Sequence, residues 1–424
     1  MSLPLNVLVV TDSFPPVCGG SGWSTWELAH GLQGRGHHVE VVKVEIGSPA
    51  GIVSGQHESV PVTTFRRKAP NVPALRNVIK NEALWRDLTT YLTRTRLSGQ
   101  QVDIIHAQHV MTTVPSIRAG AKIGIPVVAT VRDYWPVCYW SDLIYDPSQS
   151  ELCPGCSTRM MTECVKPRAG AASVAAWPLI PYMRANLRTK RRTLANASAI
   201  IAVSSTLARD LRTRAPELAA TPLYTIPNPV DMTALDRARA AAAPLDGPYI
   251  LYAGKLATNK GVQALLPAIR RAGLDLPIVV AGDGPLRDTI AAQAQTMKMN
   301  VRMLGWQPRD DVWALMRHAT LLAFPSYGPE SLSRVLIEAA ALGTPIAAMD
   351  TGGTRDIIQH RVTGLLSSDV ESFARDLAEL AADERLRHAL GHAAGLDVHA
   401  RFSATSVVER VEQVYRQLLA PEAA

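Results

Sequence analysis

Apolar and polar residues alternate between two patterns along the chain. Short, mainly apolar runs, such as LNVLVV at 5–10 and IPVVATV at 125–131, are followed by longer segments with apolar residues at helical spacing. Runs of this kind are typical of parallel strands buried on both faces, with helices as the crossovers between them. The same order returns after residue 249, with YILYAG, PIVVAG and LLAF. The pattern predicts an α/β protein with open parallel sheets, which bind ligands at the carboxyl ends of their strands.

One stretch interrupts this order and marks a domain boundary. The segment TALDRARAAAAPLDGP at 233–248 has alanines, prolines and a glycine in place of an apolar strand. We therefore expect a first domain over residues 1–232 and a second over 245–400, each Rossmann-like. An amphipathic pattern predicts a final helix within 401–424.

Composition narrows the classes of protein to which the chain could belong. Its 424 residues are 47% apolar and 19% charged, as in a soluble globular protein. The net charge is +7, but we find no compact motif for recognising nucleic acid, and we expect anionic substrates or an anionic membrane surface instead.

Two features of the sequence bear on where the protein works. The first residues form an apolar strand without a preceding basic segment, and the chain has no run of 18 apolar residues, so we expect neither a signal peptide nor a membrane span. Five cysteines without an export signal favour the cytoplasm over a disulfide framework.

The segment FPSYGPESLSRVLIEAAALG, residues 324–343, carries two acidic residues in an unusual setting. It has the composition of a buried helix ending at Gly343, and Glu338 in its middle needs a partner because burying an unpaired charge is costly. Glu330 comes at the mouth of this helix. Eight helical residues rise about 12 Å, more than the roughly 5 to 9.5 Å between the carboxylates of a glycosidase. We expect the two to hold different parts of one long ligand, with the N–H groups of Ser331 to Arg334 facing an anion.

Glycines, histidines and charged residues gather where strands of the first domain end. The loop after residues 5–10 contains Gly19-Gly20-Ser21-Gly22, which the residues alone leave open between a flexible turn and a cradle for a phosphate or sugar. Because parallel strands end at one edge of a sheet, we expect these residues to line one site. They are Gly19, Gly20, His106, His109, Arg132 and Asp133.

Four cysteines lie close together in the sequence. Cys138, Cys153, Cys156 and Cys164 have the spacing C-x14-C-x2-C-x7-C, within an insertion at about 136–166. Four thiolates with a C-x2-C core fit tetrahedral Zn²⁺, but the spacing is not that of a standard zinc finger. A structural zinc site and a loop with small buried thiols both remain open.

A basic segment follows the cysteines. WPLIPYMRANLRTKRRTL, residues 177–194, carries five basic residues at helical spacing. Such a segment can rest on anionic lipid or form a solvated helix face, and the sequence leaves both open.

The second domain carries residues suited to a diphosphate. Lys255 and Lys260 flank the glycine turn after its first strand, where they can neutralise phosphates near a helix N-terminus. Gly282 and Gly284 end the next strand. We find no Asp-x-Asp, a motif that can hold a metal ion.

The motif Glu330-x7-Glu338, followed by LGTPIAAMDTGGTRDIIQHRVTGLL, resembles the signature of the family 4 retaining glycosyltransferases of GT-B fold. The resemblance implies two Rossmann-like doubly wound domains facing a central cleft, with the C-terminal helix crossing back to the first domain. It places Glu330 at the donor sugar and Glu338 at the ribose of the nucleotide. With Glu330, it implies Lys260 and Asp133 as catalytic residues. The other donor-binding residues that it implies are Gly20, Lys255, Gly282, Gly284, Trp306, Ser331, Leu332, Ser333 and Gly353, and the acceptor-side residues are Gly19, His106, His109 and Arg132.

The chain departs from the family pattern at several of these positions. Glu-Gly-Phe-Gly becomes Glu330-Ser331-Leu332-Ser333, which narrows the sugar end and leaves the identity of the donor open. Arg132 replaces a histidine that the family often directs at the sugar, and Lys255 replaces an arginine.

The resemblance implies transfer of a sugar from a nucleoside-diphosphate sugar to a hydroxyl of a glycan, lipid or small molecule, with retention. We expect no metal cofactor for catalysis, because lysines and helix amides can stabilise the leaving diphosphate. A role in cell-envelope, polysaccharide or glycoconjugate synthesis is expected, in the cytoplasm or at the inner face of the membrane. Two alternatives are an inactive nucleotide-sugar-binding protein, which the change at Arg132 favours, and a GT-B epimerase, which the spacing of the two glutamates disfavours.

Overall fold

The computed structural model describes residues 3–96, 101–146, 151–170, 173–238 and 242–420. The chain divides into two compact units, each built around its own sheet. Unit 1 comprises Met1–Ser141, Tyr182–Pro229 and Ala404–Ala424, and unit 2 comprises Asp142–Pro181 and Val230–Ser403. Each is described separately below.

The sheet of unit 1 has eight strands in the order β10-β9-β6-β5-β1-β2-β4-β3. Its neighbours are parallel except for the edge hairpin of β3 and β4. The central strands are apolar and fully buried because helices cover both faces. The strands are β1 (Asn6–Thr11), β2 (His38–Ile46), β3 (Gly51–His57), β4 (Val60–Arg67), β5 (Ile104–Ala107), β6 (Val127–Val131), β9 (Ala199–Ala202) and β10 (Leu223–Thr225).

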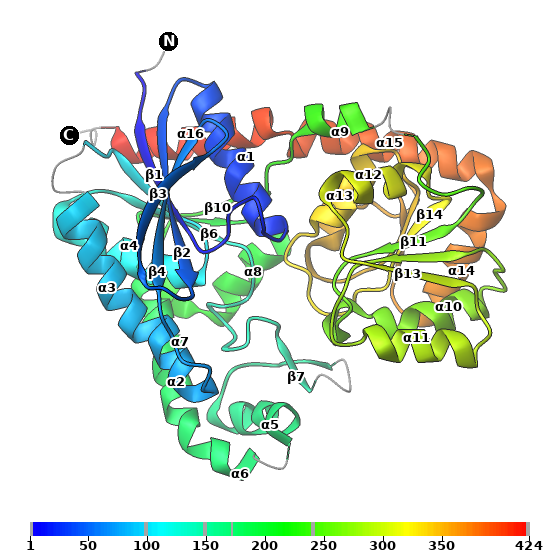
Figure 1. The fold of residues 1–424 in the computed structure, drawn as a ribbon, viewed down its shortest axis with the longest axis horizontal. Coiled ribbons are helices and arrows are strands. Elements are labelled where there is room, and N and C mark those ends of the chain that lie inside the picture. Colours follow the sequence, from blue (N-terminus) through cyan, green and yellow to red (C-terminus); the bar gives the residue numbers. More distant parts are fainter. Residues whose placement is uncertain (1–2, 97–100, 147–150, 171–172, 239–241, 421–424) are drawn as a thin grey trace. The chain divides into compact units, whose positions relative to one another are not determined.

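Helices from both ends of the chain cover the sheet of unit 1. The C-terminal helix α16 (Ala404–Leu419) lies beside α1 (Gly20–Gly34), and Val408, Val411 and Tyr415 join the apolar core over β1 (Figure 1). The amphipathic pattern of the last residues thus buries its apolar face within the first unit. The other helices are α2 (Pro73–Val78), α3 (Leu84–Tyr91), α4 (Val110–Ile123), α7 (Ile180–Leu194, from Tyr182 onward in this unit) and α8 (Ser205–Arg214).

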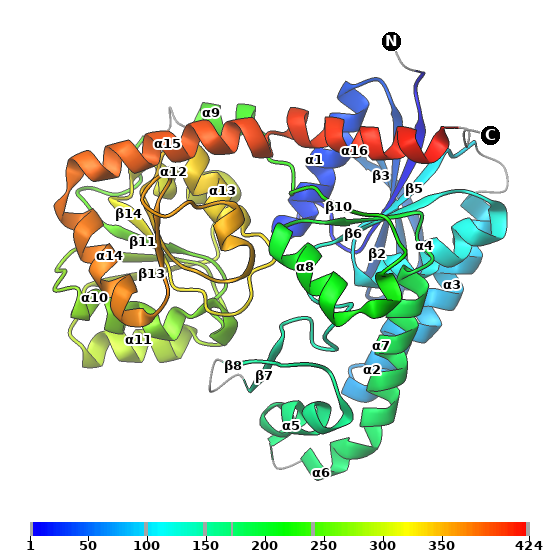
Figure 2. The same cartoon turned by 180° about the vertical axis from the view of Figure 1, so that it is seen from behind.

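The sheet of unit 2 has six parallel strands in the order β13-β12-β11-β14-β15-β16, again with helices on both faces (Figure 2). The strands are β11 (Ile250–Ala253), β12 (Ile278–Ala281), β13 (Val301–Gly305), β14 (Leu321–Phe324), β15 (Ile346–Met349) and β16 (Leu365–Ser367). The helices are α9 (Met232–Ala238), α10 (Leu265–Arg271), α11 (Arg287–Thr296), α12 (Arg309–His318), α13 (Arg334–Ala341), α14 (Val370–Ala382) and α15 (Glu384–Phe402).

Most of the cysteine-containing insertion groups with unit 2, whereas the sequence predicted it in the first domain. Residues Asp142–Pro181, expected in the first domain, group with unit 2. They form the hairpin of β7 (Ile144–Asp146) and β8 (Glu151–Leu152), then α5 (Thr158–Ala169) and α6 (Ser173–Ala176). Arg168 joins the helix to the hairpin by donating to Asp142 Oδ2 at 2.9 Å and to the carbonyl oxygens of Ile144 and Tyr145 at 2.6 and 3.0 Å.

The predicted fold class is confirmed: two Rossmann-like α/β units with open, mostly parallel sheets. Among the described residues, we find no helix with the length and apolar character needed to cross a bilayer. The predicted boundary segment at 233–248 is partly helical, because Met232–Ala238 forms α9.

Candidate functional site

Three loops at the carboxyl edge of the unit 2 sheet meet at Glu330. Its Oε1 accepts a hydrogen bond from Ser326 Oγ at 2.7 Å and pairs with Lys260 Nζ at 2.5 Å. Its main-chain oxygen accepts from the N–H of Gly353 at 2.7 Å. Because these partners follow β14, β11 and β15 respectively, one nearly buried carboxylate residue joins the loops after three neighbouring strands.

Glycines allow the loops around Glu330 to come this close. Gly261 has φ +65°, and a Cβ there would lie 1.9 Å from the carbonyl oxygen of Pro325. At Gly352, with φ +53°, a Cβ would lie 2.1 Å from the carbonyl oxygen of Glu330. Neither position accepts a side chain without backbone movement, so glycine is required at both.

The turns after β11 and β12 also depend on close backbone packing. A Cβ on Gly282 would lie 1.9 Å from the carbonyl oxygen of Gly254, and one on Gly284 would lie 2.4 Å from that of Leu256. Both glycines also have positive φ. Their roles are therefore explained by the packing of two turns, and contact with a donor stays a prediction for them. The exposed Lys255 is carried by the first of these turns.

The buried Glu338 has the partner that its position demands. Arg334 lies one turn earlier on α13, and its Nε donates to Glu338 Oε1 at 2.9 Å. Both side chains are less than one-tenth exposed. The prediction of a partner is confirmed, and this pair satisfies a charge that would otherwise be costly to bury.

The start of this helix corrects the sequence prediction. The helix was expected to present amides from Ser331 onward, but α13 begins at Arg334, with Ser333 as its N-cap. Ser333 Oγ accepts from the N–H of Leu336, so Ser331 and Leu332 lie in the preceding loop. Glu330 is therefore outside the helix, and the 12 Å rise does not describe its separation from Glu338.

Tyr252 and Thr354 also lie in this part of unit 2, and the sequence did not predict a role for Tyr252. Tyr252 donates from its hydroxyl to the carbonyl oxygen of Lys255 at 2.9 Å, and burial together with the charge of Glu330 raises its pKa. Thr354 is fully buried, and its Oγ1 has no hydrogen-bond partner among the described residues. The side chain of Trp306 is 70% exposed, and the role of this residue in donor binding stays a prediction. An apolar strand ending in Pro-Ser and the Arg-x3-Glu spacing were the signals for Ser326 and Arg334.

Unit 1 gathers a second group of polar residues at the carboxyl edge of its sheet. Asp12 follows β1, His109 precedes α4, and Asp133 comes two residues after the end of β6. His109 Nδ1 lies 3.8 Å from Asp12 Oδ1. His109 has φ +133°, a sparsely populated conformation for a residue with a side chain, and its Nε2 has no hydrogen-bond partner among the described residues.

Burial shifts the pKa values of Asp12, His109, Asp133 and Lys190 in the direction that favours the uncharged form of each. It raises the pKa of Asp12 to about 6, against the opposing hydrogen bond from the Met111 amide, and raises that of Asp133. Burial and the nearby charge of Arg132 lower the pKa of His109 to about 4. Burial lowers the pKa of Lys190 to about 8, despite the charge of Asp133. A carboxyl group that titrates near neutral pH is suited to accepting or donating a proton during a reaction.

Two residues expected on the acceptor side, His106 and Arg132, have hydrogen-bond partners within unit 1. His106 lies inside β5 and is completely buried, with Nδ1 2.5 Å from Tyr415 Oη and Nε2 2.7 Å from Thr130 Oγ1. Burial lowers its pKa to about 3, so it is a neutral residue of the core, and its role on the acceptor side stays a prediction. Arg132 is 8% exposed, and it donates to Asn228 Oδ1 at 2.7 Å and to Gln108 Oε1.

The glycine loop after β1 leads into the N-terminus of α1. Gly20 is the first residue of this helix and Gly19 is its N-cap, without a capping side chain. A Cβ on Gly19 would meet no atom within 4 Å, so packing does not require glycine there. The open approach to the helix N-terminus suits an anion or a sugar hydroxyl.

The four clustered cysteines are all described. Cys138, Cys153 and Cys164 are buried, and Cys156 is partly exposed. Cys153 Sγ donates to the carbonyl oxygen of Gly155 at 3.4 Å, and Cys164 Sγ to that of Met161 at 3.3 Å. Within the described ranges, no three or more His, Cys, Asp or Glu residues form a group that could hold a metal. Zinc at these cysteines therefore stays a prediction.

Comparisons with known proteins match both parts of the chain to glycosyltransferases. Residues 18–234, just over half of the chain, match the model of Glycosyltransferase Family 4, and residues 236–396 match that of Glycosyl transferases group 1.

Similar sequences include the alpha-maltose-1-phosphate synthase of Mycolicibacterium smegmatis, which is 23% identical over 98% of this chain and 100% of that protein. The lipopolysaccharide core biosynthesis glycosyltransferase LpsE of Rhizobium meliloti is 30% identical over 45% of this chain and 54% of its own length. The chain spans about half the length of LpsE and of several other curated relatives that it matches.

Solved structures share the fold over nearly the whole chain. The sucrose-phosphate synthase of Thermosynechococcus elongatus has a TM-score of 0.72 at 20% identity, and covers 97% of this chain and 99% of its own. HepE of Anabaena in complex with UDP has a TM-score of 0.65 at 18% identity, and covers 97% and 100%.

Proposed function

The chain belongs to glycosyltransferase family 4, and we propose that it transfers a sugar, with retention, from a nucleoside-diphosphate sugar to a hydroxyl group. The observation that carries the proposal is the pairing of Lys260 with Glu330 at the carboxyl edge of the unit 2 sheet. A cation for phosphates and a carboxylate for sugar hydroxyls stand side by side there, on loops that glycines bring into contact.

The donor diphosphate binds to Lys260 and Lys255. Lys260 is about one-third exposed, so an incoming phosphate oxygen reaches its ammonium group while Glu330 still holds it. The amides at the start of α13 add partial positive charge. Together they stabilise the charge that develops on the leaving diphosphate, and each such interaction contributes most in the transition state.

The two glutamates hold different parts of the donor. Glu330 accepts hydrogen bonds from hydroxyls of the transferred sugar, and Glu338, paired with Arg334, accepts them from the ribose. The presence of UDP in the HepE structure supports a nucleotide as ligand of this fold.

Unit 1 binds the acceptor. Asp12, His109 and Asp133 lie at the carboxyl edge of its sheet, and their shifted pKa values suit them to the acceptor's proton. The acceptor is a hydroxyl of a glycan, lipid or small molecule in envelope, polysaccharide or glycoconjugate synthesis. The reaction takes place in the cytoplasm.

A membrane contact of this enzyme uses α7. Arg188 and Arg192 are exposed on that helix, one turn apart. Exposed cations of this kind suit the surface of an anionic membrane.

A panel of UDP-, GDP- and ADP-sugars, assayed for release of free nucleotide, tests the proposal. We expect release from one nucleotide class, and in Lys260→Met a loss of rate far larger than the loss of about 1 kcal/mol in stability that breaking the pair with Glu330 should cause. Lys298→Met, which changes a lysine outside this cluster, is the matched control. Absence of release with every donor, or equal rates in the two variants, would contradict it.

A further inference from the structure

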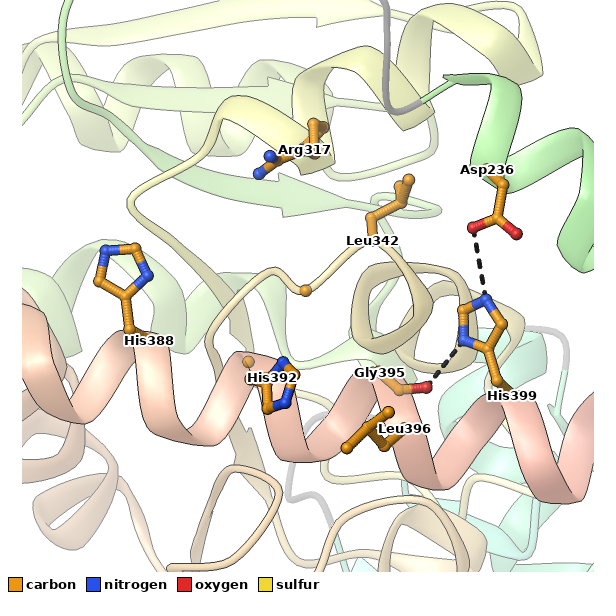
Figure 3. A pocket seen from close by; sticks show the side chains of 10 residues that line it. Asp236, Arg317, Leu342, His388, His392, Gly395, Leu396 and His399 are labelled. Carbon is orange, nitrogen blue, oxygen red and sulfur yellow. Dashed lines mark hydrogen bonds and ion pairs between the residues drawn. The ribbon is translucent and has the colours of Figure 1, made fainter.

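A cavity lies in unit 2, at the opposite end of α13 from Glu330. It has a volume of about 550 Å³ and is lined by one face of α15 and by residues of α9 and α12 (Figure 3). Leu342 and Gly343, which directly follow α13, also line it. Since Glu330 precedes this helix, the cavity, here called the α15 pocket, is distinct from the Glu330 cluster. Its volume is within the usual range of small-molecule sites.

One side of the α15 pocket is lined by basic residues. Arg317 of α12 and His388 and His392 of α15 line it. Within the described part of the chain, Arg317 and His392 have no hydrogen bond or ion pair. His388 lies 3.6 Å from Glu384, but both side chains are largely exposed and the contact is screened by water. A guanidinium group without a carboxylate partner, beside two imidazoles in a concave surface, favours an anion.

The other side of the pocket has the opposite character. Asp236 of α9 lies 3.4 Å from His399 Nε2, and His399 Nδ1 donates to the carbonyl oxygen of Gly395 at 2.7 Å. Figure 3 shows this pair apart from Arg317 and His388. A carboxylate held in this way accepts hydrogen bonds from hydroxyl groups and repels a second anion. The pocket therefore suits a ligand with one anionic end and one hydroxylated end.

Two glycines of α15 line the pocket, and packing requires glycine at only one of these two positions. A Cβ on Gly391 would lie 2.3 Å from the carbonyl oxygen of Gly343, so glycine is required there. A Cβ on Gly395 would lie 3.5 Å from its nearest neighbour, which is ordinary contact, and yet the position is glycine. Glycine inside a helix costs about 0.5–1 kcal/mol relative to alanine. The absent side chain at Gly395 leaves space in the pocket, between the basic residues on one side and Asp236 on the other.

We propose that the α15 pocket binds a phosphate monoester of a sugar or small polyol. The phosphate contacts Arg317, His388 and His392, and the hydroxyls reach Asp236 and His399. The apolar edge of the ligand packs on Leu342 and Leu396. This site is additional to the proposed donor site and does not depend on it.

Calorimetric titration of the full chain with glucose 6-phosphate as the probe tests this inference. We expect one site per chain, and binding at least tenfold weaker in Arg317→Met and in His392→Gln. Arg385→Met is the matched control, because Arg385 is an exposed arginine of α15 that does not line the pocket, and we expect it to bind as the wild type does. Melting temperatures of all variants show whether they fold.

Lys260→Met separates this site from the donor site, and we expect it to leave the affinity unchanged. Binding that falls in Lys260→Met but not in Arg317→Met would place the probe at the donor site and overturn the proposal. Equally tight binding of inorganic phosphate would overturn the assignment of a monoester. Binding of Zn²⁺ that depends on His388 and His392, with no binding of the ester, would make the pocket a metal site and likewise overturn it.

Discussion

Replacing Glu330 with glutamine separates its two roles, because the change removes the charge and keeps the shape. In the structure, the carboxylate accepts from Ser326 and pairs with Lys260, and its main-chain bond to Gly353 does not involve the side chain. In the Glu330→Gln variant, the amide oxygen of the new side chain still accepts from Ser326. We therefore expect the three loops to stay together.

The expected cost in stability is small. A charge-assisted hydrogen bond contributes about 1.5–3 kcal/mol when buried, but Lys260 is 32% exposed and water can replace part of its partner. We expect the free energy of unfolding to fall by about 1 kcal/mol.

Glu330→Gln should change the affinity for nucleotide and the rate of sugar transfer in different ways. In Glu330→Gln, Lys260 is no longer shared with a carboxylate, so the free nucleoside diphosphate should bind as tightly as before or up to about tenfold more tightly. Transfer should fall by about 10- to 100-fold in kcat/KM, because a charged acceptor for the sugar hydroxyls is lost.

Calorimetry with the nucleoside diphosphate and initial rates of transfer measure the two effects. Glu379→Gln is the matched control, because Glu379 pairs with Arg361 at the surface of the same unit. Nucleotide binding that weakens together with the rate, in proportion to lost stability, would show that Glu330 only holds the loops and would refute the reasoning.

Three further predictions concern other parts of the chain. Glu338→Gln should weaken binding of the nucleoside diphosphate by about 1.5–3 kcal/mol and leave binding of inorganic pyrophosphate unchanged, because the contact is to the ribose; calorimetry with both ligands checks this, and equal losses would count against it. In unit 1, burial would raise the pKa of Glu412, but hydrogen bonds from Arg35 and Arg416 outweigh it and lower the value to about 2. The folded pKa lies below the unfolded one, so the stabilisation is present above about pH 4.5 and is lost as the pH falls toward 2. In urea melts, Glu412→Gln should be less stable than the wild type by about 2–3 kcal/mol at pH 7, with the difference shrinking below about pH 4.5, and a constant difference would contradict the assignment. If the cysteine cluster holds zinc, anaerobically purified protein should contain about one Zn²⁺ per chain and Cys153→Ser should lower the melting temperature; elemental analysis that finds no metal would end that hypothesis.

The fold followed from the sequence because its signal is local and repeated. Apolar runs such as 250–253 and 278–281 are strands at the predicted places, since a short apolar run bounded by turn residues is typical of a strand buried on both faces. The partner of Glu338 could also be anticipated, because burial of a charge demands one.

Other parts of the site depend on contacts distant in sequence, which no local pattern reveals. The pairing of Lys260 with Glu330 joins residues 70 positions apart and requires the positive φ of Gly261. His106 was placed at a strand end, but it lies inside β5 because Tyr415 of α16 and Thr130 satisfy its ring in the core. The start of α13 was misplaced because an acidic residue such as Glu330 suits the first turn of a helix, whereas in the structure Ser333 is the N-cap.

The central claim is retaining transfer from a nucleotide sugar without a metal at the leaving diphosphate. Its most direct test is proton NMR of the first product formed from the active donor, recorded with and without chelator. The account predicts that the product keeps the donor's anomeric configuration, and that the rate is the same in both samples while the protein remains folded. A product of inverted configuration, or a rate that chelator abolishes and Mg²⁺ restores, would contradict it.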